Sequence, residues 1–184
     1  MPDGTGQRNI VLVIGGARSG KSRYALESAE RRWPTPLYLA TAEGGDEEMR
    51  RRIELHRQAR GPRWRCAEEP LDVAAILRSP PAPCDGILLD CVTIWLSNVL
   101  LREGREGVAR RRADLLAALR ASGPDVILVS NEVGMGIVPP SELGREFRDL
   151  AGWLNQDLAA VAPQVVFVVA GLPLALKGAL PCAG

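Results

Sequence analysis

The fold is decided by Gly15-Gly16-Ala17-Arg18-Ser19-Gly20-Lys21-Ser22, a stretch that matches the phosphate-binding pattern G-x-x-x-x-G-K-[ST] at every fixed position. Glycine at Gly15 and Gly20 permits backbone angles and a close approach that a Cβ would block. Lys21 brings a mobile ammonium to the outer phosphates, and the Ser22 hydroxyl is suited to bind Mg²⁺. The stretch therefore predicts a loop, the P-loop, that holds the phosphates of a nucleoside triphosphate.

The segments on either side of the P-loop strengthen this interpretation. The pattern arises by chance in roughly one chain of this length in a hundred. Residues 10–14 are apolar and mostly β-branched, which predicts a buried parallel strand. Residues 22–32 predict a helix that stops before Pro34 and Pro36. A strand before the motif and a helix after it form the setting that the motif requires.

The rest of the chain continues the alternation of strands and helices. Further apolar strands are expected at residues 37–41, 86–90, 125–130 and 165–170. Helices are expected at residues 46–60, 69–77, 93–103, 108–121 and 141–161, the last with Ser141 as its N-cap. This order is typical of an α/β fold: a P-loop NTPase-like, mostly parallel sheet with helices on both faces. We expect an N-terminal extension, residues 1–9, and a single nucleotide-binding catalytic domain, residues 10–180.

The composition argues against several other classes of protein. The chain has 23 basic and 22 acidic residues and a formal charge of +1, which is unsuited to broad nucleic-acid binding. Its four cysteines form no C-x-x-C pair and have no histidine cluster beside them, which argues against a zinc site. No apolar run approaches ~20 residues, so we expect no membrane insertion and a cytoplasmic location.

Polar residues at strand ends are the candidates for the rest of the site. Asp90 closes the strand at residues 86–90 and is either the acid of a Mg²⁺ site or an ordinary turn residue. Asn131 and Glu132 follow another strand and belong either to a substrate loop or to a tight turn. Polar residues of the helix at 141–161 are either ligands or its outer face, and for any one of them the outer face is the expectation. They are Arg145, Arg148, Asp149, Asn155 and Gln156.

His56 is the only histidine, and it lies on the charged helix predicted at residues 46–60. A lone surface histidine usually has no function. This helix, however, begins at the carboxyl edge of the sheet, where ligands bind in such folds. A neutral imidazole beside a triphosphate is a good nucleophile for phosphorus. The residues alone leave both interpretations of His56 open.

The P-loop is one of several segments that together resemble a known family. The segments are residues 15–22, 38–42, 52–57, 64–68, 131–139 and 147–156. With them the chain resembles, over nearly its whole length, the bifunctional adenosylcobinamide kinase / adenosylcobinamide-phosphate guanylyltransferase family of cobalamin biosynthesis. The segment at residues 131–139 is far more specific to that family than the P-loop is.

The resemblance implies two reactions. ATP or GTP first phosphorylates adenosylcobinamide. GTP then donates GMP to adenosylcobinamide phosphate, which gives adenosylcobinamide-GDP and pyrophosphate. In the family the second reaction passes through a guanylylated histidine, and His56 occupies the matching position. The resemblance also implies a homo-oligomer that needs Mg²⁺, with Lys21 as a second catalytic residue.

The family's GTP contacts carry over to residues in five parts of this chain, and its metal contacts to Ser22 and Asp90. The GTP contacts are Gly15, Gly16, Ala17, Arg18, Ser19, Gly20, Lys21, Ser22, Ala40, Thr41, Ala42, Arg57, Gln58, Ala59, Arg60, Glu68 and Asp90. Two other functions remain as alternatives. One is a P-loop protein that uses nucleotide as a switch and needs no nucleophilic histidine. The other is a small-molecule kinase without the transferase step.

Overall fold

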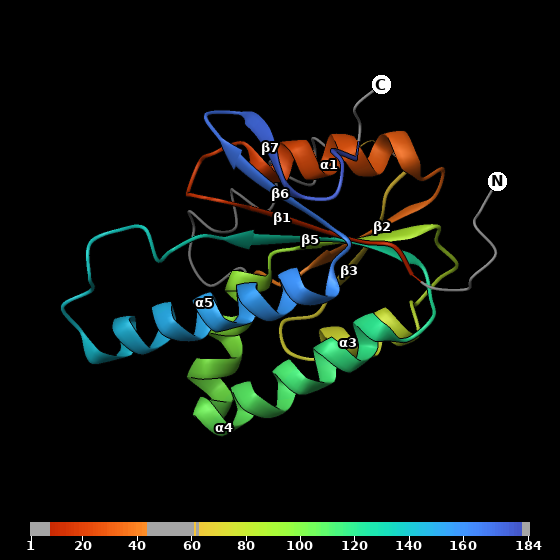
Figure 1. Ribbon diagram of the computed structural model, residues 1–184. Helices are drawn as coiled ribbons and strands as arrows, with labels where there is room; N and C mark the ends of the chain where they lie inside the picture. The colour runs from red at the N-terminus through yellow and green to blue at the C-terminus, as the bar shows by residue number, and fades with distance from the viewer. Residues whose placement is uncertain (1–7, 44–60, 62, 182–184) are drawn as a thin grey trace.

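One sheet of seven strands forms the centre of the molecule (Figure 1). The computed structural model describes residues 8–43, 61 and 63–181. Their elements are β1 (Ile10–Gly15), α1 (Lys21–Arg32), β2 (Pro36–Ala40), β3 (Arg65–Glu68), α3 (Val73–Arg78), β4 (Gly86–Asp90), α4 (Val92–Arg120), β5 (Asp125–Asn131), α5 (Glu142–Val161), β6 (Gln164–Val169) and β7 (Leu172–Lys177). The strand order is β3-β2-β4-β5-β1-β6-β7, and β7 alone runs antiparallel to its neighbour.

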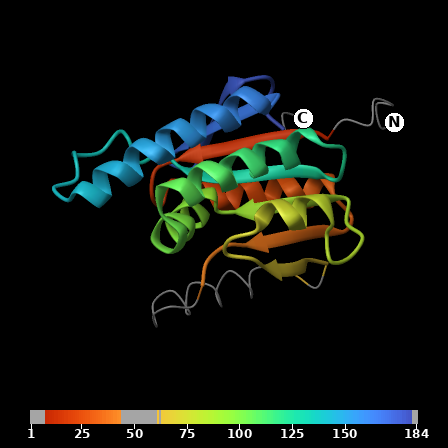
Figure 2. The ribbon, with the colours of Figure 1, turned by 90° about the horizontal axis from the view of Figure 1, so that it is seen from below.

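The helices cover both faces of the sheet, as the sequence predicts. Helix α1 lies on one face, and α3, α4 and α5 lie side by side across the other (Figures 1 and 2). Along β1 the side chains alternate between the two faces. Val11 and Val13 pack in one cluster with Ala25 and Ala29 of α1, whereas Leu12 belongs to the cluster beneath α3, α4 and α5. Burial on both faces explains why β1 is an unbroken apolar run.

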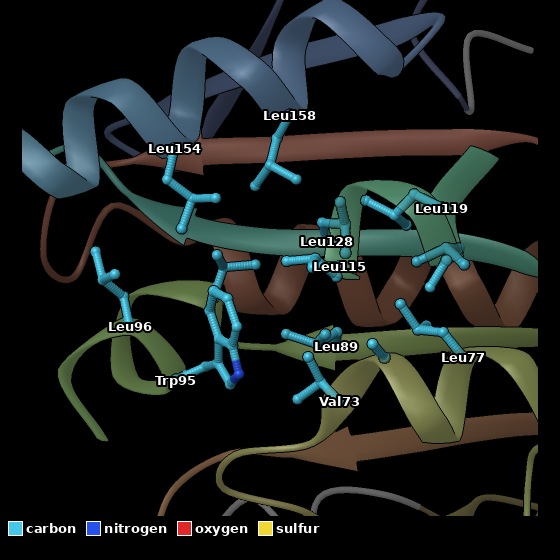
Figure 3. Packing of buried hydrophobic residues seen from close by; sticks show 14 of the residues in the cluster. Val73, Leu77, Leu89, Trp95, Leu96, Leu115, Leu119, Leu128, Leu154 and Leu158 are labelled. Carbon is cyan, nitrogen blue, oxygen red and sulfur yellow. The ribbon is translucent and has the colours of Figure 1, made fainter. Parts of the chain in front are cut away.

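The apolar cluster beneath α3, α4 and α5 packs the start of α4 against the end of β4. Trp95 is 1% exposed and packs in one cluster with Leu89, Leu96 and Val73 (Figure 3). Its indole Nε1 donates a hydrogen bond of 2.8 Å to the carbonyl of Leu71, which satisfies the polar atom of this buried ring. The ring thereby joins α4 to the segment that follows β3.

Helix α4 contains both helices predicted at residues 93–103 and 108–121. The break between them lies at Gly104, whose φ of 67° is outside the helical region. A glycine adopts this left-handed angle at little cost. Figure 1 shows α4 changing direction along its length. The second part of the helix leads the chain back toward the start of β5.

The fold class and the five predicted apolar strands are confirmed, but the sequence analysis missed β3 and β7. Both are edge strands, and their side chains are mostly exposed, so neither has the apolar pattern of a core strand. The helix predicted at residues 69–77 begins only at Val73, because Asp72 caps it by accepting a hydrogen bond from the Ala75 N–H. The predicted cap of α5 is confirmed, since Ser141 accepts from the Gly144 N–H at 3.2 Å. The helix predicted at residues 46–60 lies outside the described residues.

Candidate active site

Six strands run in the same direction, so the ends of β1 to β5 meet at one edge of the sheet, on the left in Figure 1. The P-loop joins β1 to α1 at this edge. A Cβ on Gly15 would lie 2.4 Å from the carbonyl oxygen of Val168 and 2.6 Å from Ser19 Oγ. Gly20 has a φ of +95°, which side chains disfavour. Both fixed glycines of the motif are therefore required by the backbone.

The P-loop leaves the N-terminal end of α1 open toward an anion. Gly20 occupies the N-cap position without a side-chain hydrogen bond, and the first turn contains no acidic residue. The N–H groups and the dipole of such a helix end attract phosphate. Ser19 Oγ is also buried here without a hydrogen-bond partner among the described residues. A phosphate oxygen would satisfy it, so the loop suits the group that the motif predicts.

Lys21 folds back over the P-loop. Its side chain is 9% exposed, and its Nζ donates to the Gly16 carbonyl at 3.1 Å. The ammonium is thus held against the loop whose backbone would surround the phosphates. A cation in that position offsets the negative charge of a bound triphosphate.

Asp90 is separated from the P-loop strand by one strand, because β5 lies between β4 and β1. Its half-buried carboxylate accepts a hydrogen bond from Tyr38 Oη at 3.1 Å. No cluster of three or more His, Cys, Asp or Glu side chains able to hold a metal occurs in the described part of the chain. Mg²⁺ bound with a triphosphate needs only one or two protein oxygens. Ser22 and Asp90 provide oxygens of the required kind.

Cys91 follows Asp90, but it is not a nucleophile at neutral pH. Burial, together with the charge of Asp90, raises the pKa of the Cys91 thiol to about 11. Its sulfur accepts a hydrogen bond of 3.4 Å from the Ile94 N–H and caps α4. Since the thiolate is the reactive form, this cysteine is structural.

The predicted nucleotide segment Ala40, Thr41 and Ala42 continues from β2. Thr41 is fully buried, and its hydroxyl donates to the Cys91 carbonyl at 2.8 Å and accepts from the Cys91 N–H at 3.0 Å. Asn98 of α4 donates to the Thr41 carbonyl at 2.8 Å. The Thr41 side chain therefore holds the segment against α4. Ala40 and Ala42 are only half-buried at this edge.

Glu68 and Asp90 flank the same residue from opposite sides. In the sheet register, Ala40 pairs with Glu68 of β3 and with Asp90 of β4. The structure thus brings the two predicted acids to one level of the carboxyl edge. Glu68 is the more exposed of the two.

Asn131 and Glu132 lie beside the first residue of the P-loop. Asn131 pairs with Gly15 in the register of β1 and β5, and the Glu132 N–H donates to the Gly15 carbonyl at 3.1 Å. The Glu132 carboxylate accepts from the Gly134 N–H at 2.7 Å. The structure therefore places the predicted substrate loop next to the phosphate cradle.

Buried polar residues support this edge, namely Thr93, Ser130 and Asn155. Sequence reasoning missed Thr93 and Ser130, and its expectation that Asn155 belongs to the outer polar face of the helix is wrong. Asn155 is one turn from Ala151 on the buried face of α5, so it does not belong to an outer polar face. Its spacing from the apolar residues of α5 is the signal that identifies it as buried. The predicted nucleophile and its neighbours, His56, Arg57, Gln58, Ala59 and Arg60, lie outside the described residues.

These features together define a P-loop nucleotide-binding protein. The sheet is mostly parallel, and the glycines Gly15 and Gly20 lead to a helix end that is open toward an anion. Lys21 folds back over the loop, and Asp90 lies two strands away from β1. The described helices include none with the length and apolar character needed to cross a membrane. The family profile described as cobinamide kinase / cobinamide phosphate guanyltransferase matches residues 11–176. The chain belongs to this family. It is accordingly a bifunctional kinase and guanylyltransferase of cobalamin biosynthesis.

Similar proteins are known from several bacteria. The bifunctional adenosylcobalamin biosynthesis protein CobP of Pseudomonas aeruginosa is 48% identical over 91% of this chain and 96% of its own length. The bifunctional adenosylcobalamin biosynthesis protein CobU of Salmonella typhimurium is 42% identical over 91% of this chain and 99% of its own length. Among solved structures, the RadB recombinase covers 86% of this chain and 73% of its own at 16% identity, with a TM-score of 0.46.

Proposed function

We propose that this chain phosphorylates adenosylcobinamide with ATP or GTP and then transfers GMP from GTP to adenosylcobinamide phosphate through a guanylylated His56. The products are adenosylcobinamide-GDP and pyrophosphate. The observation that carries the proposal is the P-loop at the carboxyl edge in a chain that matches the family over residues 11–176. The family supplies the pair of reactions, and the P-loop supplies the place for the donor nucleotide.

In the phosphorylation, the chain orients the triphosphate and offsets its charge. The backbone of residues 15–22 surrounds the phosphates, and the α1 dipole points toward them. The Lys21 ammonium approaches the outer phosphates as the γ-phosphoryl group moves to the acceptor hydroxyl. Ser22 and Asp90 would hold Mg²⁺, which neutralises charge on the phosphate oxygens when it is bound. Asn131 and Glu132, which lie beside Gly15, are the residues proposed to contact the acceptor.

In the transfer of GMP, the neutral His56 imidazole attacks the α-phosphorus of GTP. A bond between nitrogen and phosphorus forms as the bond from phosphorus to the pyrophosphate oxygen breaks, and pyrophosphate leaves. A phosphate oxygen of adenosylcobinamide phosphate then attacks the same phosphorus, which releases His56. Ala40 and Ala42 flank the nucleotide, and the buried Thr41 between them anchors the segment through its hydrogen bonds to Cys91. The remaining GTP contacts are Arg57, Gln58, Ala59, Arg60, Glu68 and Asp90.

The active form is a homo-oligomer in this proposal. Leu172, Leu174 and Leu176 are all more than half exposed on the edge strand β7, and Leu172 and Leu174 alternate onto the same face of it. An exposed apolar row on an edge strand is a surface that folded proteins usually cover. A second copy of the chain is the occupant proposed here. We also infer a single catalytic domain at residues 10–180, because all seven strands of the described residues belong to one sheet. A cytoplasmic location is part of the same proposal.

A labelling experiment separates this function from its alternatives. The protein is incubated with Mg²⁺ and GTP radiolabelled on the α-phosphorus, and is then denatured. Acid-labile, alkali-stable label is expected in the wild type and not in His56→Asn, which contains no histidine at all. GTP labelled on the γ-phosphorus serves as the control and should leave no such label.

The other outcomes favour other functions. Phosphorylation of cobinamide without α-label would mean a kinase that lacks the histidine route. Nucleotide binding with neither activity would favour a switch protein. Label retained in His56→Asn would refute the assignment of the nucleophile.

A further inference from the structure

The peptide group between Asn131 and Glu132 links the P-loop to helix α5. Its N–H, on Glu132, donates to the carbonyl of Gly15 at 3.1 Å. Its carbonyl, on Asn131, accepts from Asn155 Nδ2 of α5 at 3.1 Å. One rigid peptide plane therefore has the first residue of the phosphate cradle on one side and a side chain of α5 on the other.

A second helix holds the preceding peptide group. The Asn131 N–H donates to Thr93 Oγ1 of α4 at 2.7 Å. Ser130 Oγ donates to Asn155 Oδ1 at 2.6 Å and lies 3.3 Å from Thr93 Oγ1. The end of β5 is thus fixed by side chains from both α4 and α5. These side chains also contact each other through Ser130.

All three side chains are buried, which strengthens the effect of their hydrogen bonds. Asn155 is 8% exposed, Thr93 7% and Ser130 3%. Both ends of the Asn155 amide are bonded, so the amide has a single orientation. Hydrogen bonds in a buried network reinforce one another, and a lost partner leaves a buried polar group unsatisfied.

Packing alone does not account for an asparagine at this position. The other buried residues of α5 are Leu150, Ala151, Leu154 and Leu158, so Asn155 is the one polar member of that set. An apolar residue there would avoid the cost of burying an amide. The hydrogen bond from the Asn155 amide to the peptide group beside Gly15 therefore accounts for an asparagine at this position.

We propose that Asn155 is a positioning residue, which acts with Thr93 through the Asn131–Glu132 peptide group to fix Gly15 and the P-loop for both reactions. Gly15 is also closely packed against β6, since a Cβ there would lie 2.4 Å from the Val168 carbonyl oxygen. A shift of Glu132 therefore moves the phosphate cradle. The inference rests on the proposed function where it concerns catalysis, because both reactions use that cradle.

The test compares variants that alter the hydrogen bonds of the network. Asn155→Asp keeps an acceptor for Ser130 but places an oxygen opposite the Asn131 carbonyl. Thr93→Val removes the acceptor for the Asn131 N–H, and Thr93→Ser restores a hydroxyl. Trp95→Phe is the matched control, because it deletes another buried bond from a side chain to a carbonyl, at 2.8 Å, on α4.

Four quantities are measured for each variant: the melting temperature, the Kd for GTP with Mg²⁺, and the kcat and KM of each reaction per folded molecule. Asn155→Asp and Thr93→Val should lower kcat of both reactions by a similar factor of about tenfold or more, because small misplacements of bound reactants are costly. Both should also raise the Kd for GTP. Thr93→Ser should recover most of the lost activity, and Trp95→Phe should lower only the melting temperature.

A folded Asn155→Asp enzyme with unchanged kcat and Kd would overturn the proposal, as would an equal kinetic loss in Trp95→Phe. If Asn155→Asp does not fold, the Thr93→Val and Thr93→Ser pair decides the question from the other helix. If the wild type catalyses neither reaction, the proposed function fails, and the Kd for GTP alone still decides whether Asn155 positions the P-loop.

Discussion

The phenol of Tyr38 donates a hydrogen bond to Asp90 Oδ2 across 3.1 Å, from the neighbouring strand β2. Tyr38 is itself buried and packs edge-on against Trp64, with 6.1 Å between the ring centres. The proposed metal-binding carboxylate is therefore oriented by a side chain that has little freedom to move. This arrangement gives Asp90 one oxygen directed at Tyr38 and leaves the other for a different partner.

Removing that phenol should weaken Mg²⁺ binding. In Tyr38→Phe the lost hydrogen bond is worth about 1 kcal/mol, so the Mg²⁺ concentration for half-maximal activity should rise about fivefold. The affinity for GTP without Mg²⁺ should stay unchanged and serves as the internal control. An equal loss of GTP affinity with and without Mg²⁺ would show that Tyr38 acts on the fold and not on the metal site.

Two adjacent glycines of the P-loop should differ in their tolerance of alanine. Gly15→Ala forces a Cβ against the Val168 carbonyl and should lower the free energy of unfolding by about 1–3 kcal/mol, in the range of overpacked sites. Gly16→Ala meets no atom of the described residues within 4 Å, so its unfolding free energy should change little. Denaturant unfolding of both variants measures the difference. Equal destabilisation would contradict the position of Gly15 between β5 and β6.

The Cys91 thiol should make the fold less stable in alkali. Its pKa is about 11 in the folded state against a usual 9.0, so between these values the unfolded chain loses the proton and the folded chain keeps it. Stability from this group is complete below pH 9 and falls by about 1.4 kcal/mol per pH unit above it. Cys91→Ser keeps a capping atom and should remove this slope. Urea unfolding of the wild type and Cys91→Ser from pH 9 to pH 11 measures the free energy of unfolding of each protein. The same pH dependence in both proteins would contradict this prediction.

The exposed leucines of β7 should hold the oligomer together. Leu174→Asp places a charge in the middle of this apolar row and should shift the protein to a smaller species in light scattering after gel filtration. Leu101→Asp is the matched control, since Leu101 is 68% exposed on α4 and lies outside the row. Dissociation by Leu101→Asp alone would place the interface on another surface.

The sequence was sufficient where a residue's task is local. The P-loop, the strands with two buried faces and the Ser141 cap are all visible as short patterns, because the backbone angles or the burial that they need restrict the residue types nearby. Asp90 could also be predicted to lie at a strand end, because the apolar run at residues 86–89 precedes it. Glu68 came only from the family resemblance, since the strand that ends with it has no apolar run.

The residues that were missed, or expected on the wrong face of a helix, make their contacts with distant parts of the chain. Asn155 meets Ser130 and Asn131, and nothing near Asn155 in the sequence indicates that α5 crosses the end of β5. Strands β3 and β7 were not predicted for a related reason. Each is an edge strand defined by its pairing with one neighbouring strand, and its exposed side chains have no pattern that would indicate this pairing. Long-range register is the information that the residues alone do not provide.

The chain has one P-loop motif, and the ends of its parallel strands converge on that single cradle. In the proposed function both reactions use this one cradle, so a molecule that holds the donor nucleotide of one reaction excludes the donor of the other. When ATP is the phosphoryl donor, it then competes with the GTP needed for guanylylation, and the ratio of the two nucleotides controls how much of the second product forms. Excess ATP should act as a competitive inhibitor of GMP transfer, and mixing the nucleotides in steady-state assays would reveal that competition.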